Sequence, residues 1–337
     1  MPEQRWRFIQ HSSLNDKYTP RVMHSHAIIR FACSFSGTIT NYFKKVDVVI
    51  FSELVISFFG IELSDNQKEW FASDGKELRG SILKGDTRGE AVVQVVGHKN
   101  RMVYKQGFYN GKKESERPCV SGLLEGELGS QKITLDALHL IPETVKQIEK
   151  QKGVFLIGVK ENQQELLEEI KMIATHDTPM KQHSDSEKSN GRIDTRTYTG
   201  FVLNNPYLDQ RWQLANFQTV IKVERHSYNC KSKTESNETS YYISNQKINQ
   251  DTTDNELFHA IRGHWNVETN NHIRDVTFKE DNLKTKYPAM ARNMATCRTG
   301  LLNLLYQLKP KNIKAKLEEF ADNFQNLLLW LNQCNFL

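Results

Sequence analysis

Two aspartates follow short runs of strand-forming residues. Asp74 comes after Trp-Phe-Ala-Ser, and Asp136 comes after Lys-Ile-Thr-Leu. In open α/β sheets, ligands and metal ions bind at the carboxyl ends of the strands. Two carboxylates that converge there repel each other unless a divalent cation lies between them. An acid after a strand is often only a turn residue, but the pair, with Lys76 and Arg79 beside the first, favours a metal site about as much as it favours two turns.

A polar helical face surrounds a third acid, Glu268. If the segment 262–275 is helical, one face carries His264, Glu268, Asn271, His272 and Asp275. This face is too polar for a core, and a solvated surface is the plain alternative. The spacing of its two histidines around Glu268 also resembles a zinc site, although the H-E-x-x-H arrangement is missing.

Two strand aspartates and one helix glutamate make a hard, all-oxygen site, which suits a pair of Mg²⁺ or Mn²⁺ ions. Two such ions activate water or a 3′-hydroxyl and stabilise the leaving oxygen of a phosphodiester. The basic and polar residues nearby are then expected to hold DNA backbone phosphates or to support the acids. They are Lys76, Arg79, Arg262, His264, Asn271 and Arg274.

Composition limits the class of protein. The chain has 337 residues, a formal net charge of +5 and 38% hydrophobic residues, which is typical of a protein with a real core and permits a polyanionic partner without requiring one. The longest apolar stretch, 48–61, is too short for a membrane span and is interrupted by Glu53. The basic N-terminus lacks a signal core, and the five scattered cysteines disfavour disulfides, so we expect a cytoplasmic protein.

Hydrophobic periodicity predicts an α/β sheet with a crossover connection. Strands are expected near 70–74, 90–97, 102–108, 132–137 and 153–159, and helices at 141–152 and 163–173, the second capped by Asn162. The polar stretch 175–190 is expected to loop out. Three further strand candidates, 192–198, 219–225 and 239–244, indicate a β-rich insertion, and helices follow from residue 254.

Six stretches in order resemble the DDE transposases of bacterial insertion sequences, in the As-type group that includes the H-repeat-associated proteins. They are Asp-Gly-Lys-Glu-Leu-Arg-Gly-Ser from 74, Ile-Thr-Leu-Asp-Ala from 133, Val-Lys-Glu-Asn-Gln from 159, Gly-Arg-Ile-Asp-Thr-Arg from 191, Tyr-Tyr-Ile-Ser from 241 and Arg-Gly-His-Trp-Asn-Val-Glu from 262. The chain departs from the family pattern at Glu161, where a glycine is usual.

The resemblance implies an RNase H-like mixed sheet flanked by helices, with a β-rich insertion before the last catalytic helix. It implies the catalytic and metal-binding triad Asp74, Asp136 and Glu268, and it adds Lys160 to the DNA-binding residues. The implied partners are two Mg²⁺ or Mn²⁺ ions, double-stranded DNA (inverted-repeat ends and target) and a second copy in a homodimer, in the nucleoid of a bacterial cytoplasm.

The expected divisions are a truncated, partly helical region 1–68, a first catalytic part 69–174, the insertion 175–252, and C-terminal helices 253–337 that complete the core. The function implied is metal-dependent DNA cleavage and strand transfer. Two alternatives stay open: a decayed copy that binds DNA without transposing, and a structure-selective nuclease on the same fold.

Overall fold

The computed structural model describes residues 41–59, 63, 68–203, 210–249 and 255–333. The larger compact unit ends at Lys311, and two helices beyond it, α10 (Ile313–Asp322) and α11 (Phe324–Gln333), belong to a separate unit. Within that unit the rings of Phe320 and Trp330 stack with centroids 5.3 Å apart. Most of the expected region 1–68 lies outside the described residues, and its described part contains helix α3 (Val48–Ser57).

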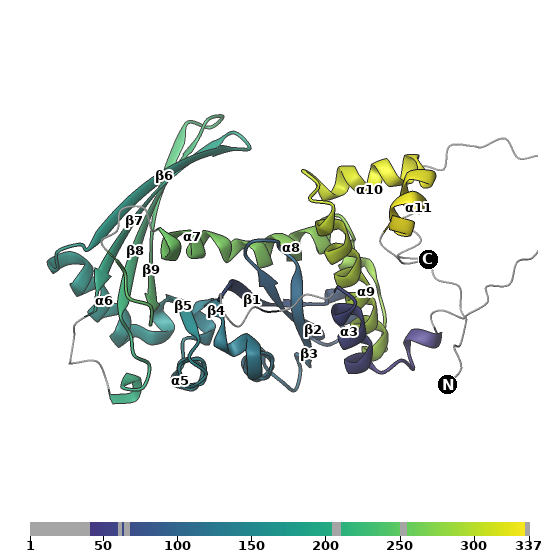
Figure 1. Cartoon of the computed structure of the whole chain (residues 1–337), viewed down its shortest axis with the longest axis horizontal. Helices are drawn as coiled ribbons and strands as arrows, with labels where there is room; N and C mark the ends of the chain where they lie inside the picture. The colour runs from purple at the N-terminus through teal and green to yellow at the C-terminus, as the bar shows by residue number, and fades with distance from the viewer. Residues whose placement is uncertain (1–40, 60–62, 64–67, 204–209, 250–254, 334–337) are drawn as a thin grey trace, which may run out of the picture. The chain divides into compact units, whose positions relative to one another are not determined.

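Nine strands of the described residues form one sheet in the order β3-β2-β1-β4-β5-β9-β8-β7-β6 (Figure 1). Strands β1, β4 and β5 are parallel, and the other neighbours are antiparallel. The mixed α/β sheet flanked by helices that the sequence predicts is therefore confirmed. The strands are β1 (Trp70–Glu77), β2 (Glu90–Gly97), β3 (Val103–Asn110), β4 (Lys132–Leu135), β5 (Val154–Val159), β6 (Lys181–Ser189), β7 (Arg192–Val202), β8 (Thr219–Asn229) and β9 (Thr234–Ser244).

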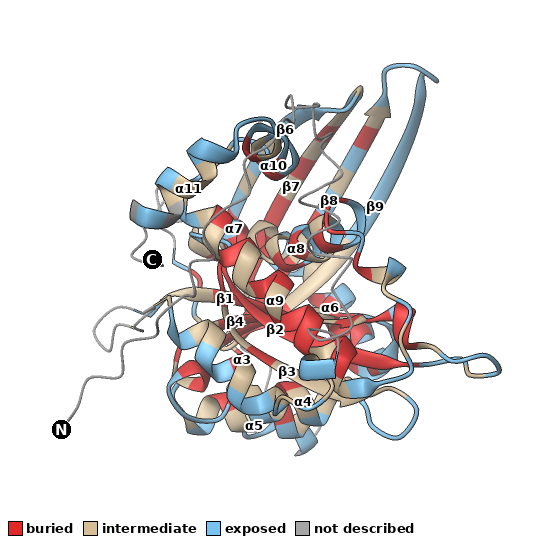
Figure 2. Cartoon of the chain, turned by 90° about the vertical axis from the view of Figure 1, so that its right-hand side faces the viewer, coloured by how far each residue is buried: buried red, intermediate tan, exposed pale blue. Residues whose placement is uncertain are grey.

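Helices cover both faces of the sheet, and alternate residues of each strand contact different helices. Phe71 of β1 packs in the cluster with α4 (Glu116–Leu123), α5 (Pro142–Lys150) and α6 (Gln164–His176). The next residue, Ala72, packs against Val267 on the opposite face, where α7 (Glu256–Gly263), α8 (Trp265–Val276) and α9 (Pro288–Gln307) lie. Figure 2 shows the buried centre of the sheet between these layers.

The stretch 175–190 does not loop out as the sequence predicted. Its second half is the edge strand β6, which pairs with β7 from Lys181 to Ser189. A polar sequence forms this strand because an edge strand needs few apolar contacts when its partner supplies the backbone hydrogen bonds. On its inner side the ring of His183 stacks on Tyr198 and Phe258. Strands β6 to β9 continue the sheet beyond β5.

Asn162 does not cap a helix, contrary to the expectation from the sequence. Its side-chain amide donates to the backbone oxygen of Ala137 at 2.7 Å, and α6 begins at Gln164 without a side-chain cap. Asn162 therefore ties the loop after β5 to the loop after β4, beside Asp136. Among the described residues no helix is long and apolar enough to cross a membrane.

Candidate active site

Asp74 and Asp136 lie level with each other on neighbouring parallel strands. The parallel pairing of β1 with β4 ends at Ala72 opposite Thr134, and each aspartate follows its paired residue by two positions. Residues two apart point to the same face of a strand, so both acids share the α8 face of the sheet. Unlike the expected strand end, β1 continues past Asp74 to Glu77, because its antiparallel pairing with β2 goes on.

Helix α8 lies across this edge and carries Glu268. Its buried side is anchored by Val267 and by Asn270, whose side-chain amide donates to the backbone oxygen of Arg101. One turn after Glu268, Asn271 donates to Oδ2 of Asp74 at 3.2 Å. A turn further, Asp275 forms an ion pair with Lys76 at 2.7 Å. The stripe of Glu268, Asn271 and Asp275 therefore faces the acidic part of β1.

The charges of these acids are coupled. Burial, together with the nearby carboxylates of Glu116, Asp136 and Glu268, raises the pKa of Asp74 to about 7, against a hydrogen bond from the backbone of Gly75. The pKa of Glu268 is also raised, first by burial and then by Asp136, while Lys160 opposes the shift. Asp74 and Glu268 thus both experience the negative charge of Asp136.

A cavity of about 870 Å³ opens beside these acids. Asp136, Glu268, Lys160 and His264 line it, together with Tyr242 of β9. The cavity therefore combines two of the acids with a lysine that neutralises part of their charge. Its walls come from β4, β5, β9 and α7–α8, so the continuation of the sheet beyond β5 contributes to it.

A threonine orients two histidines at the edge of the cavity. Nε2 of His98 and Nδ1 of His264 each lie 3.0 Å from the hydroxyl oxygen of Thr134, and this hydroxyl donates to the backbone oxygen of Phe71. Since the single hydroxyl proton goes to Phe71, both ring nitrogens must donate to the oxygen. Burial lowers the pKa of His98 to about 3 and that of His264 to about 4, so both rings are neutral.

A fourth carboxylate lies at this edge, and the sequence patterns missed it. Glu116 is the first residue of α4, on the opposite face from α8, and its Oε1 accepts a hydrogen bond from Nε2 of the buried His139 at 2.9 Å. The same histidine nitrogen lies 3.9 Å from Oδ1 of Asp136. No strand end, motif or expected helix marks Glu116 in the sequence, and α4 is a finding of the structure.

The donor set fits a hard divalent cation by its chemistry, because carboxylate oxygens are the ligands that such ions prefer. A bound cation would also reduce the electrostatic repulsion between Asp74 and the neighbouring carboxylates. The side chains are not arranged as a formed site: among the described residues no group of three or more His, Cys, Asp or Glu could hold a metal ion as it stands. The zinc-like spacing likewise forms no ligand set, since Nδ1 of His264 is bonded to Thr134 and His272 is exposed.

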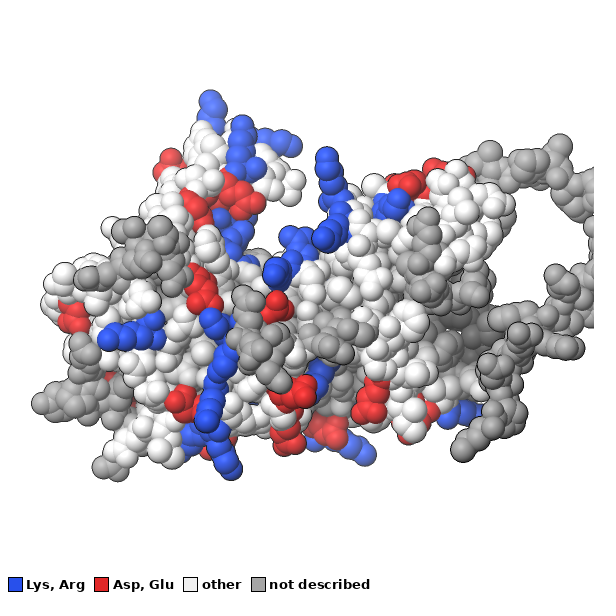
Figure 3. All heavy atoms as spheres, viewed as in Figure 1, with Lys and Arg blue, Asp and Glu red and all other residues white. Residues whose placement is uncertain are grey.

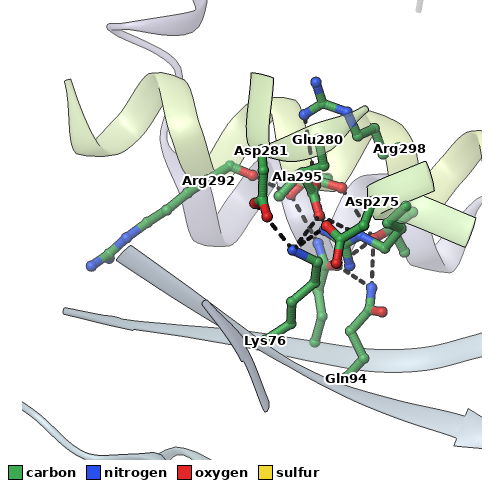
Figure 4. Close-up of polar contacts among 12 residues, drawn as sticks. Lys76, Gln94, Asp275, Glu280, Asp281, Arg292, Ala295 and Arg298 are labelled. Carbon is green, nitrogen blue, oxygen red and sulfur yellow. Dashed lines mark hydrogen bonds and ion pairs between the residues drawn. The ribbon is translucent and has the colours of Figure 1, made fainter. Parts of the chain in front are cut away.

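Two residues expected to contact DNA are buried instead. Lys76 is 8% exposed and pairs with Asp275, Glu280 and Asp281 (Figure 4). Arg274 is fully buried and donates two hydrogen bonds to Glu280, at 2.7 and 2.9 Å. Neither side chain is available to a phosphate, so both expectations are wrong. The two residues join β1, α8 and the turn after α8.

The other expected DNA contacts differ in their surroundings. Asn271 and His264 are half-buried and support Asp74 and Thr134. Arg79 and Lys160 are exposed, and Arg262 is half-exposed with its guanidinium 3.1 Å from Glu187. On the face in Figure 3, lysine and arginine side chains gather over β6–β9 and near α7–α8, with carboxylates among them.

Comparisons with known proteins give relatives by sequence. The chain is 28% identical to YbfL of Escherichia coli K12 over 277 residues, which is 80% of this chain and 72% of the relative. It is 27% identical to the H repeat-associated YhhI of the same strain, again over 80% and 72%, and 27% identical to YncI of Escherichia coli O157:H7 over 85% and 75%. YhhI and YncI are named as candidate transposases.

No family model matches the chain. Among solved structures, the piggyBac transposase synaptic complex with hairpin DNA matches with a TM-score of 0.37 and 12% identity, over 75% of this chain and 51% of that chain. A likeness of this degree carries no argument about fold or chemistry. The sequence relatives are more informative, and at the level of the family they indicate a transposase.

Proposed function

We propose that the chain, whose sequence relatives include H repeat-associated and candidate transposases, is a DDE-type transposase that cuts and joins DNA at the ends of an insertion sequence. The observation that carries the proposal is the level placement of Asp74 and Asp136, with the polar stripe of α8 against them. Its catalytic acids are Asp74, Asp136 and Glu268. Divalent ions, Mg²⁺ or Mn²⁺, supply the activation of the attacking oxygen when bound.

The chain's own residues have separate tasks in this proposal. Asn271 orients the carboxylate of Asp74 through its hydrogen bond. The backbone N–H of Leu138 donates to Oδ1 of Asp136 at 3.0 Å and leaves the other oxygen for a cation. Lys160, which lines the cavity with Glu268 and lowers its pKa, holds a phosphate of the bound DNA.

The division of the chain follows the same proposal. Strands β1 to β5 with α7 and α8 make up an RNase H-like catalytic core, and β6–β9, within 175–252, are the insertion before the catalytic glutamate. The pairing of β9 with β5 supports this division, because it brings Tyr242 of the insertion to the wall of the cavity that Glu268 also lines. The DNA partner is the inverted-repeat end together with the target, held by a homodimer.

The experiment compares binding and cutting on one end-containing duplex. Asp136→Ala should bind this DNA as well as wild type, because affinity comes mainly from Lys and Arg, and should cut nothing in Mg²⁺ or Mn²⁺. Asp177→Ala, which removes an exposed acid after α6, is the matched control and should cut like wild type. Gel shift and nicking are measured on the same samples.

The outcomes separate the alternatives. Metal-dependent cutting by Asp136→Ala removes this residue from catalysis. Wild type that binds the ends but never cuts indicates a decayed copy, and cutting without joining indicates a nuclease. Loss of cutting in Asp177→Ala would mean that the assay responds to general damage and not to the site.

A further inference from the structure

We infer that Arg117 of α4 binds a backbone phosphate of the DNA, so that one strand crosses the carboxyl edge of β4 and β5 from the α8 layer to the α4 layer. The inference rests on the proposed function and deepens it, because it names the path of the strand through the site. The ligand is a phosphodiester group close to the one that is cut. Lys171 of α6 extends the same path.

The cavity beside the acids passes over the edge of the sheet. Besides Asp136 and Glu268, it is lined by Arg117 of α4 and Lys171 of α6, together with Lys160. Helices α4 and α8 pack on opposite faces of the sheet (Figure 2). A space that residues of both helices line must therefore cross the ends of β4 and β5 between them. A linear ligand can enter along α8 and leave along α4.

Three cations of this cavity come from three separate elements. Arg117 belongs to α4, Lys160 follows β5, and Lys171 belongs to α6. A nucleic-acid strand carries one negative charge at each nucleotide, so a series of separate cations suits it better than it suits a ligand with a single charge. Glu161 lines the cavity too, so positive charge alone does not select a phosphate. What distinguishes Arg117 is the way its guanidinium is held.

The guanidinium of Arg117 is oriented by the turn that carries Asp136. Its Nε donates to the backbone oxygen of Leu138 at 3.0 Å, and the backbone N–H of Leu138 donates to Oδ1 of Asp136, also at 3.0 Å. One residue therefore holds both the arginine and the proposed catalytic aspartate. The N–H groups on Nη1 and Nη2 remain for a ligand, and they form the forked donor that binds two oxygens of a phosphate.

Arg117 also lacks an acidic partner of its own. Its neighbour Glu116 pairs with His139, and no ion pair of Arg117 is found in the part of the chain that the structure describes. By contrast, Lys76 and Arg274 are neutralised by carboxylates. A half-buried guanidinium that is oriented but has no counter-charge is available to a phosphate that passes through the cavity.

The test combines protein variants with changes in the DNA. Affinity for the end-containing duplex is measured by fluorescence anisotropy without metal. In further duplexes, one phosphate at a time on either side of the cleaved bond is replaced by an uncharged methylphosphonate. Arg117→Gln removes the charge, and Arg117→Lys keeps the charge without the fork. Lys113→Gln, which removes an exposed cation just before α4 that does not line the cavity, is the matched control.

We expect Arg117→Gln to reduce the slope of log affinity against log salt by about one unit, which is about tenfold in affinity at about 0.1 M salt. Arg117→Lys and Lys113→Gln should keep the slope. Wild type and Lys113→Gln should lose affinity at one methylphosphonate near the cleaved bond, and Arg117→Gln should not respond there, because its contact with that phosphate is already lost. Circular dichroism checks the fold, and if Arg117→Gln is unfolded, a weaker response of Arg117→Lys at the same phosphate replaces it.

Two results would overturn the inference. One is a folded Arg117→Gln with the salt slope of wild type. The other is an Arg117 variant that responds to every methylphosphonate as wild type does. Wild type that does not bind the end-containing duplex instead overturns the proposed function, so the two failures are distinguishable.

Discussion

The ammonium group of Lys76 and the carboxylate of Asp275 lie 2.7 Å apart and join strand β1 to helix α8. Lys76 follows Asp74 by two residues on the strand, and Asp275 follows Glu268 by two helical turns. The ion pair therefore fixes how far α8 is shifted along β1, which sets the distance between Asp74 and Glu268. Glu280 and Asp281, 3.7 and 3.3 Å from the same ammonium group, surround it with negative charge.

We predict that Lys76→Met lowers the free energy of unfolding by about 3–5 kcal/mol, because it removes the buried ammonium group that pairs with Asp275, Glu280 and Asp281. Asp275→Asn should cost less than about 1 kcal/mol, since Asp275 is partly exposed and Lys76 keeps two other carboxylates. Urea denaturation followed by circular dichroism measures both variants. Equal losses would contradict the unequal burial of the two partners.

The pKa of Asp74 predicts the sign of a stability change with pH. Its ordinary value is 3.8 and its value in the folded chain is about 7. Between these values the folded protein keeps a proton that the unfolded chain has lost, so this group's contribution to stability falls as the pH rises. Asp74→Asn removes this dependence, and at about pH 8 the variant should be more stable than wild type by roughly 1–3 kcal/mol.

The check is the difference in urea midpoint between Asp74→Asn and wild type at several pH values. It should be small near about pH 4 and grow up to about pH 8. Asp177→Asn, an exposed acid, is the control and should show no such trend. A constant difference across this range would mean that Asp74 titrates at the same pH in both states.

Local patterns were sufficient for the parts of the site that lie on strands. Short strand-forming runs marked β1 and β4, and the shared acid position after each run predicted that Asp74 and Asp136 lie at one edge of the sheet. The polar face of α8 was visible for the same reason, because three- and four-residue spacing defines a helix face. In each case the information lies within a few residues of chain.

Contacts between distant segments were beyond such patterns. Whether Lys76 or Arg274 faces DNA depends on Glu280, which lies after α8 and folds back onto both. Glu116 reaches the site only because Gly75 has no side chain, which no spacing along α4 reveals. The strand β6 was missed because its residues are polar, and its partner β7 decides its conformation.

Arg274→Met provides a test of the burial of this arginine. Removal of the guanidinium leaves the buried Glu280 with only Arg298, at 3.6 Å, and Lys76, so we expect a loss of about 3–5 kcal/mol in unfolding free energy. The slope of log affinity for DNA against log salt should not change, because the side chain reaches no phosphate. A shallower slope in Arg274→Met, measured by fluorescence anisotropy under conditions where it is folded, would restore Arg274 as a DNA contact.

The two histidines on Thr134 predict loss of stability in acid. The folded-state pKa values are about 3 for His98 and about 4 for His264, below the ordinary 6.5. Below about pH 6.5 the histidines of the unfolded chain bind protons, whereas His98 and His264 of the folded protein stay neutral. The contribution of the two histidines to stability therefore falls as the pH drops toward 4. Nitrogen-15 NMR of the imidazoles should find both rings neutral at about pH 5. A ring that is protonated there would contradict the lowering of its pKa by burial.

Lys160 lowers the pKa of Glu268 and is also proposed to contact a DNA phosphate, and Lys160→Gln tests the two roles separately. The positive charge opposes the rise in the pKa of Glu268, so its removal should raise that pKa further and move the onset of cleavage to higher pH. As a phosphate contact, Lys160 should also account for about one unit of the slope of log affinity against log salt. Lys150→Gln, an exposed lysine on α5 at the other face of the sheet, is the control and should change neither quantity. Anisotropy titrations from low to high salt, with nicking rates across pH on the same duplex, test both effects, and an unchanged slope in Lys160→Gln would leave Lys160 with its electrostatic role toward Glu268 alone.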